Sequence, residues 1–144
     1  MSEADLWTRT RDKLGPFGLL KRVENRVEVG TPDAHYLLRR KPGGRVTAVW
    51  LELKHESAWP RHAGTPVCFE ILTLEQVQWH QDYAELGGRV YTLAQVDRTI
   101  LLLDARTTAD VYWGRLTRRA LEARALVVDA ERYPTGRLIK CLTA

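Results

Sequence analysis

The chain has 144 residues, a formal net charge of +4, and 44% apolar and 28% charged residues. This composition is typical of a globular protein, and the length is enough for a core that needs no disulfide or metal support. No apolar run approaches the roughly 20 residues that span a bilayer, and the N-terminal Met-Ser-Glu-Ala-Asp lacks the basic and apolar regions of a signal peptide. We therefore expect one domain over residues 1–144, with no membrane partner and a cytoplasmic location.

The first thirty residues predict a helix and then a strand. Residues 3–14 show no strand alternation, and Gly15 and Pro16 follow them, so we expect a short helix that ends there. Residues 22–29 are expected to form a strand, because Arg-Val-Glu-Val alternates at its end.

The next segment predicts an antiparallel hairpin. Residues 33–41 and 45–54 flank a Pro-Gly-Gly turn signal, so the two halves are expected to pair. Apolar residues at alternate positions of the second half place Glu52 and Lys54 on one face. The fold-back also brings Asp33 toward Glu52, so we expect two carboxylates and a lysine to converge at one end of a sheet.

The second half of the chain predicts more helices and strands. A Thr-x-x-Gln capping box at Thr73 and Gln76 opens a helix that ends at a Gly-Gly pair, and in it we expect Trp79 to pack and His80 to be exposed. The other expected elements are a loop over 55–66, a short strand or extended segment over 67–71, strands over 89–93, 99–103 and 137–142, and helices beginning at 107 and 117. Together these elements predict an α/β fold with a central mixed β-sheet flanked by α-helices.

Arginine supplies 17 of the 22 basic residues, which favours bidentate contacts with phosphate. Four of the cations crowd the tip of the predicted hairpin: Arg39, Arg40, Lys41 and Arg45. Like charges repel one another there unless a negative partner such as a nucleic-acid backbone is present. The alternative is that these four charged side chains are simply solvated and bind no partner. The carboxylate motif next to the hairpin favours DNA, so we expect these four residues to bind it.

Two carboxylates at a strand end suit a hard divalent cation. Mg²⁺ prefers oxygen ligands and keeps water or substrate phosphate in its remaining positions. We therefore expect a Mg²⁺ site at Asp33 and Glu52, where Mn²⁺ is expected to substitute. Lys54 would orient or deprotonate an attacking water, or offset charge on the phosphate.

Four elements in a fixed order resemble a known family. Pro32-Asp33, the triplet Glu52-Leu53-Lys54, the helix at 72–80 and the Gly-Gly-Arg-Val that follows it resemble the PD-(D/E)XK nuclease superfamily, in particular its VRR-NUC branch. The resemblance covers roughly residues 22–97 and implies a restriction-endonuclease-like core. It also implies a Mg²⁺-dependent DNA endonuclease that leaves 5′-phosphate and 3′-hydroxyl ends.

The resemblance assigns roles to individual residues. It implies that Asp33, Glu52, Lys54 and Gln76 are catalytic, and that Asp33, Glu52 and the Leu53 main-chain carbonyl bind the metal. An acidic residue upstream of the Pro-Asp pair often completes such a site, and here Glu24 is the candidate, with Glu28 as the alternative.

The substrate is less determined. A small chain without a predicted second domain favours a structure-selective Holliday junction resolvase of phage or prokaryotic type, and two symmetric nicks would need a C2 homodimer. A VRR-NUC-type flap or general nicking nuclease is the alternative, and a non-catalytic DNA-binding subunit of the same fold is another. The sequence has no Walker loop, dinucleotide fingerprint, Gly-x-Ser-x-Gly elbow or paired histidines, so we expect no nucleotide cofactor and no zinc or serine hydrolase chemistry.

Overall fold

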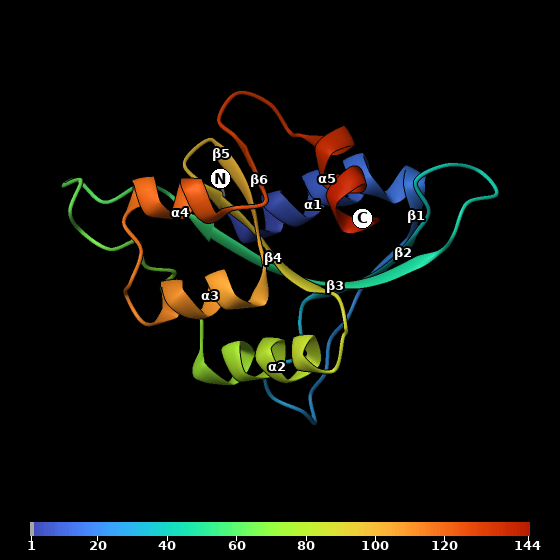
Figure 1. Cartoon of the computed structure of the whole chain (residues 1–144), viewed down its shortest axis with the longest axis horizontal. Coiled ribbons are helices and arrows are strands. Elements are labelled where there is room, and N and C mark those ends of the chain that lie inside the picture. Colours follow the sequence, from blue (N-terminus) through green and yellow to red (C-terminus); the bar gives the residue numbers. More distant parts are fainter. Residues whose placement is uncertain (1) are drawn as a thin grey trace.

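A computed structural model describes residues 2–144, which form one six-stranded sheet with helices on both faces (Figure 1). The strands are β1 (Gly18–Arg22), β2 (Ala34–Leu38), β3 (Thr47–Glu56), β4 (Val90–Val96), β5 (Thr99–Leu103) and β6 (Val127–Asp129). They lie side by side in sequence order. Every neighbouring pair is antiparallel except β3 and β4, which are parallel. The predicted α/β class with a mixed sheet is confirmed.

The helices are α1 (Glu3–Leu14), the 3₁₀ helix η1 (Gly15–Phe17), α2 (Leu74–Glu85), α3 (Ala105–Tyr112), α4 (Arg118–Arg124) and α5 (Thr135–Leu142). α1 and α5 cover one face of the sheet, and α2, α3 and α4 cover the other (Figure 1). Because β3 and β4 are parallel, a crossover must join them, and α2 lies in that connection. Among residues 2–144, no helix is long and apolar enough to cross a membrane.

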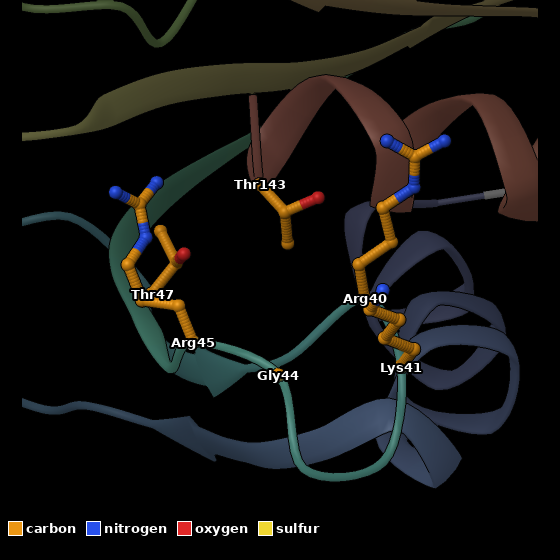
Figure 2. A pocket seen from close by; sticks show the side chains of 6 residues that line it. All are labelled: Arg40, Lys41, Gly44, Arg45, Thr47 and Thr143. Carbon is orange, nitrogen blue, oxygen red and sulfur yellow. The ribbon is translucent and has the colours of Figure 1, made fainter.

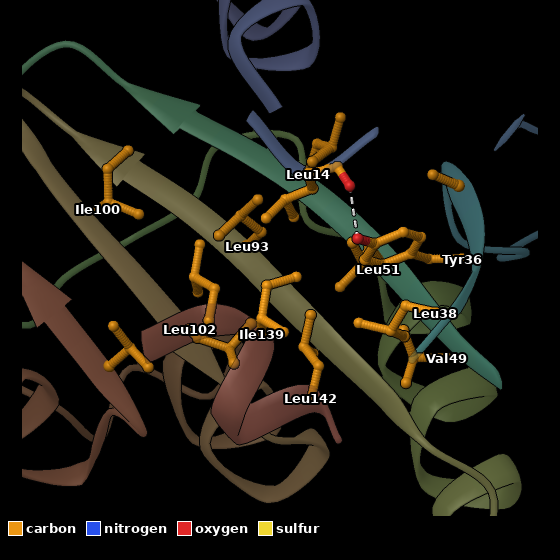
Figure 3. Packing of buried hydrophobic residues seen from close by; sticks show 14 of the residues in the cluster. Leu14, Tyr36, Leu38, Val49, Leu51, Leu93, Ile100, Leu102, Ile139 and Leu142 are labelled. Carbon is orange, nitrogen blue, oxygen red and sulfur yellow. Dashed lines mark hydrogen bonds between the residues drawn. The ribbon is translucent and has the colours of Figure 1, made fainter. Parts of the chain in front are cut away.

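Each face of the sheet has its own apolar core. The face under α1 and α5 buries alternate residues of β2 and β3 against Leu138, Ile139 and Leu142 of α5 (Figure 3). The hydroxyl of the buried Tyr36 donates a hydrogen bond to the Leu14 carbonyl, which ties β2 to the end of α1. The alternation that buries one set of β3 side chains here directs Glu52 and Lys54 to the opposite face, under α2.

The strand predicted over 22–29 is wrong. β1 ends at Arg22, and residues 23 to 33 form an irregular loop. The Asn25 side-chain oxygen accepts hydrogen bonds from the amides of Val27 and Glu28, so these amides are turned away from a strand ladder. The alternating valines face solvent instead of a core, with Val27 96% exposed.

The strand predicted over 137–142 is also wrong, because this segment is the helix α5. Leu138, Ile139 and Leu142 are buried together at helical spacing, and a short apolar run fits either period until its packing partner is known. Residues 67–71 form no strand, although Val67 and Phe69 are buried. The short strand β6 was not predicted. The helices α1 and α2, the antiparallel pairing of β2 with β3, and the strands β4 and β5 follow the predictions.

Candidate active site

Glu52 and Lys54 form a buried ion pair on β3. Their exposed fractions are 0% and 2%, and Lys54 Nζ lies 3.2 Å from Glu52 Oε1. Lys54 Nζ also donates to the Ile71 carbonyl at 3.3 Å, just before α2. The prediction that these two side chains share one face of the strand is confirmed.

Asp33 reaches the same end of the sheet from the residue before β2. The register pairs Ala34 with Leu51, which sets Asp33 beside Glu52 and Leu53. Asp33 Oδ2 accepts a hydrogen bond of 2.7 Å from the Leu53 amide, and the carboxylate is half-buried. The hairpin therefore brings Asp33, Glu52 and Lys54 together as the turn signal predicts.

Gln76 uses both ends of its side-chain amide. Its Oε1 accepts from the Thr73 amide at 3.0 Å and completes the capping box of α2, while its Nε2 donates to Glu52 Oε1 at 2.6 Å. The start of α2 is itself held close to the loop of residues 23 to 33, because Gly30 approaches the backbone of Glu75 and Gln76 closely. Gln76 therefore caps α2 and contacts the candidate active site at the same time, and both contacts were predicted.

The charge state of Glu52 is set by its surroundings. Burial, followed by the charge of Asp33, raises the pKa of Glu52 to about 8, and Lys54 opposes this increase only in part. Glu52 Oε1 has two partners, whereas Oε2 is buried without a hydrogen-bond partner within residues 2–144. Below this pKa of about 8 the carboxyl keeps its proton, so Oε2 becomes a ligand position when a cation displaces that proton.

A third carboxylate approaches from α1 and was missed. Burial and the charge of Asp33 raise the pKa of Glu3, and Lys54 and Arg22 act on it in the opposite direction. Its Oε2 is also buried without a partner in the described part of the chain. Glu24 and Glu28, the upstream acids that were predicted, lie exposed in the loop after β1. Glu3 is therefore the upstream carboxylate whose electrostatics are coupled to the centre.

The prediction that His80 is exposed is wrong. It lies on α2 one turn after Gln76 and is fully buried. Burial and the positive charge of Lys54 lower the pKa of His80 to about 4, which keeps the ring neutral at physiological pH. Trp79 packs as predicted, with its ring against Trp50 and Tyr83.

The basic hairpin lies away from this centre. Arg40, Lys41 and Arg45 surround a pocket of about 370 Å³ whose other wall includes Thr47 and Thr143 (Figure 2). Thr47 is five residues before Glu52 on β3, or roughly 17 Å at 3.4 Å per residue, and its side chain points to the opposite face. The hairpin cations were expected to bind DNA because they lie near the carboxylates in the sequence. In the folded structure the cations are not near the carboxylates.

The donor set fits a hard cation only in part. Asp33, just before β2, and Glu52 Oε2, in the second half of β3, supply the carboxyl oxygens that Mg²⁺ prefers, and Leu53 lies between Glu52 and Lys54 in the same strand. Among residues 2–144, no three histidine, cysteine, aspartate or glutamate side chains are grouped closely enough to hold a metal ion. Two carboxylates would leave the remaining positions of Mg²⁺ to water and phosphate.

Comparison with protein-family models finds no match to the chain, and comparison with curated proteins finds none either.

Proposed function

We propose that the chain is a metal-dependent nuclease that hydrolyses phosphodiester bonds in DNA. The observation that carries the proposal is the grouping of Asp33, Glu52 and Lys54 at the open end of the β2–β3 hairpin, with Glu52 Oε2 buried and without a hydrogen-bond partner among residues 2–144. This oxygen costs folding free energy in a core and gains a role when a cation is present. Asp33 and Glu52, with the Leu53 main-chain carbonyl, would hold Mg²⁺ or Mn²⁺.

Different residues would have different roles around a scissile phosphate. When bound, Mg²⁺ neutralises phosphate charge and lowers the pKa of its water. Gln76 engages Glu52 Oε1 and so keeps Oε2 directed elsewhere. Lys54 Nζ donates to the Glu52 side chain and to the Ile71 carbonyl, so two acceptors fix its place beside the proposed metal site. We therefore propose that Lys54 offsets the charge that develops on the phosphate, in preference to acting as a base.

Two cationic pockets would contact the DNA on different sides. One is the hairpin pocket of Arg40, Lys41 and Arg45. The other, of about 440 Å³, lies between the loop after β3 and α4 and includes Arg61 and Arg119; we call it the loop–α4 pocket. α4 packs on the same face as α2, and the loop begins at the end of β3 that carries Lys54.

These positions favour branched DNA as the substrate. A straight duplex over the catalytic face reaches the loop–α4 pocket but not the hairpin pocket, which opens on the opposite face. Arms that diverge from a junction reach both. We therefore propose a four-way junction as the preferred substrate and a C2 homodimer as the acting form, since paired nicks need two copies of the site.

Cleavage of a panel of labelled substrates tests the proposal. Four-way junction, flap, duplex and single-stranded DNA are incubated with Mg²⁺ and the wild-type, Asp33→Asn or Lys54→Ala protein. Glu131→Gln and Lys140→Ala are matched controls, because both side chains are exposed and remote from the site. We expect symmetric nicks in the junction from the wild-type and control proteins only.

The other outcomes separate the alternatives. Cleavage of flaps and duplexes at comparable rates supports a flap or general nicking nuclease. Tight binding by a folded wild-type protein, without cleavage of any substrate in Mg²⁺ or Mn²⁺, overturns the nuclease proposal and supports a DNA-binding subunit.

A further inference from the structure

His80 is a buried polar side chain that has no hydrogen-bond partner in the described part of the chain. Its exposed fraction is 0%, and neither Nδ1 nor Nε2 has a hydrogen-bond partner within residues 2–144. A buried polar atom left in this state lowers the stability of the fold, and an apolar side chain of similar size would avoid that cost. A histidine at this place therefore needs a reason beyond packing.

His80 lies on the face of α2 that meets the candidate active site. Gln76 and His80 are four residues apart on α2 and so share one face of the helix. Gln76 on that face bonds Glu52, and the charge of Lys54, two residues further along β3, acts on the His80 ring. α2 thus presents an amide to the glutamate and an imidazole to the lysine.

Lys54 has one hydrogen-bond donor left. A lysine ammonium has three N–H groups. Within the described chain, Glu52 Oε1 and the Ile71 carbonyl are the two acceptors in reach of Lys54 Nζ. A neutral imidazole has one nitrogen that accepts a hydrogen bond, and both His80 nitrogens are unused.

We propose that His80 is a positioning residue for Lys54, whose third N–H reaches the ring nitrogen through one internal water. With three fixed acceptors, the ammonium has one orientation relative to Glu52 and to the substrate phosphate. The neutral ring achieves this without adding a second positive charge beside the lysine. The expected effect of His80 on cleavage rests on the proposed nuclease function. The interaction between His80 and Lys54 does not depend on that function.

A purely structural role makes the opposite prediction for the same substitution. If His80 only fills space, His80→Leu keeps cleavage unchanged. If His80 positions Lys54, His80→Leu leaves a buried Lys54 N–H without its acceptor, so cleavage falls and the unfolding midpoint does not rise. His80→Gln is the matched variant, because its amide oxygen can accept the hydrogen bond in place of the ring nitrogen.

The test combines cleavage with the nuclear magnetic resonance signal of the Lys54 ammonium, which is one of five lysines in the chain. We expect His80→Leu to lower kcat by about 10- to 100-fold with little change in KM, as for a misplaced catalytic group. The ammonium protons of Lys54 should also exchange faster with water. His80→Gln should restore most of both readouts.

Wild-type exchange and wild-type kcat in a folded His80→Leu protein would overturn the proposal. So would a His80→Gln protein that behaves like the leucine variant. Because the exchange measurement needs no DNA and no metal, it separates a failure of this contact from a failure of the nuclease proposal.

Discussion

The two ends of the β2–β3 hairpin carry charge in opposite ways. At one end, Glu52 and Lys54 are buried and bonded to each other, and Gln76 holds the glutamate. At the other end, Arg40 and Arg45 are exposed, and neither has an ion pair within residues 2–144. Buried charges depend on exact partners, whereas exposed charges act over distance and are screened by salt. The first end therefore suits chemistry and the second suits attraction of a polyanion.

The largest effect is expected at the buried end, from Glu52→Gln. The amide keeps the shape of the side chain but loses the anionic oxygen, and metal-assisted catalysis contributes several kcal/mol. We expect cleavage to fall by about a thousandfold, which corresponds to roughly 4 kcal/mol. Single-turnover kinetics measure this loss, and Glu131→Gln is the control. Near-normal cleavage by the glutamine variant would remove Glu52 from the site.

The same carboxyl predicts a pH-dependent stability in the absence of metal. The pKa of Glu52 is raised to about 8 from an ordinary value of 4.5, so between these values the folded state binds more protons than the unfolded state. Stability from this group is therefore fully present below about pH 4.5 and is lost as the pH rises to about 8.

Urea unfolding in a chelator, measured at intervals between pH 5 and pH 8, checks this linkage. We expect the free energy of unfolding to fall by up to a few kcal/mol over that range. The decline should be smaller in Glu52→Gln, which does not titrate. An equal decline in both proteins would assign the pH dependence to other groups.

The sequence predicts the centre only where local rules act. Asp33, Glu52 and Lys54 are brought together by a turn signal and a period of two, and both are readable without tertiary information. Glu3 is different, because α1 reaches the centre only through its packing on the sheet, about thirty residues upstream of Asp33. No local pattern near Glu3 indicates this contact.

Two other errors have different causes. Burial of His80 was predictable in principle, since it lies four residues after Gln76 and shares its helix face. The distance between the hairpin pocket and the centre was also readable, because a hairpin tip and its open end lie at opposite ends of the same strands. The helix α5 is hard to tell from a strand in the sequence, because the run is only eight residues long and its apolar residues are nearly continuous over 138–142.

Substitution of two glycines compares how strictly the backbone is constrained at the two ends of the β2–β3 hairpin. Gly30 has φ 93° and touches α2, where an added Cβ would lie 2.5 Å from the Glu75 carbonyl oxygen. Gly43 in the hairpin has φ 75°, with open space around it. We expect Gly43→Ala to cost about 1 kcal/mol from backbone strain alone, and Gly30→Ala to cost up to about 3 kcal/mol.

Only the Gly30 substitution should affect cleavage, because it displaces the turn that carries Gln76. Urea unfolding gives the two stability changes, and cleavage at a temperature where both proteins are folded gives the second readout. Equal cleavage rates for the Gly30→Ala and Gly43→Ala proteins would mean that the loop of residues 23 to 33 does not position α2.

The smallest effects are expected from the exposed charges, and they distinguish the two pockets. Arg40→Ala/Arg45→Ala removes charge from the hairpin pocket, and Arg61→Ala/Arg119→Ala does so at the loop–α4 pocket. Each neutralised phosphate contributes about 0.9 to the slope of log affinity against log salt. We therefore expect each double variant to lower the slope on a four-way junction by up to roughly 2.

On a straight duplex the two pockets should differ. The loop–α4 variant should still lose slope there, and the hairpin variant should match the wild-type protein, because its pocket opens on the other face of the sheet. Fluorescence anisotropy titrations over a range of salt give both slopes, and Arg106→Ala/Arg132→Ala controls for the loss of two exposed arginines. An equal loss by the hairpin variant on duplex and on junction would mean that one duplex reaches both pockets, and the preference for branched DNA would lose its structural support.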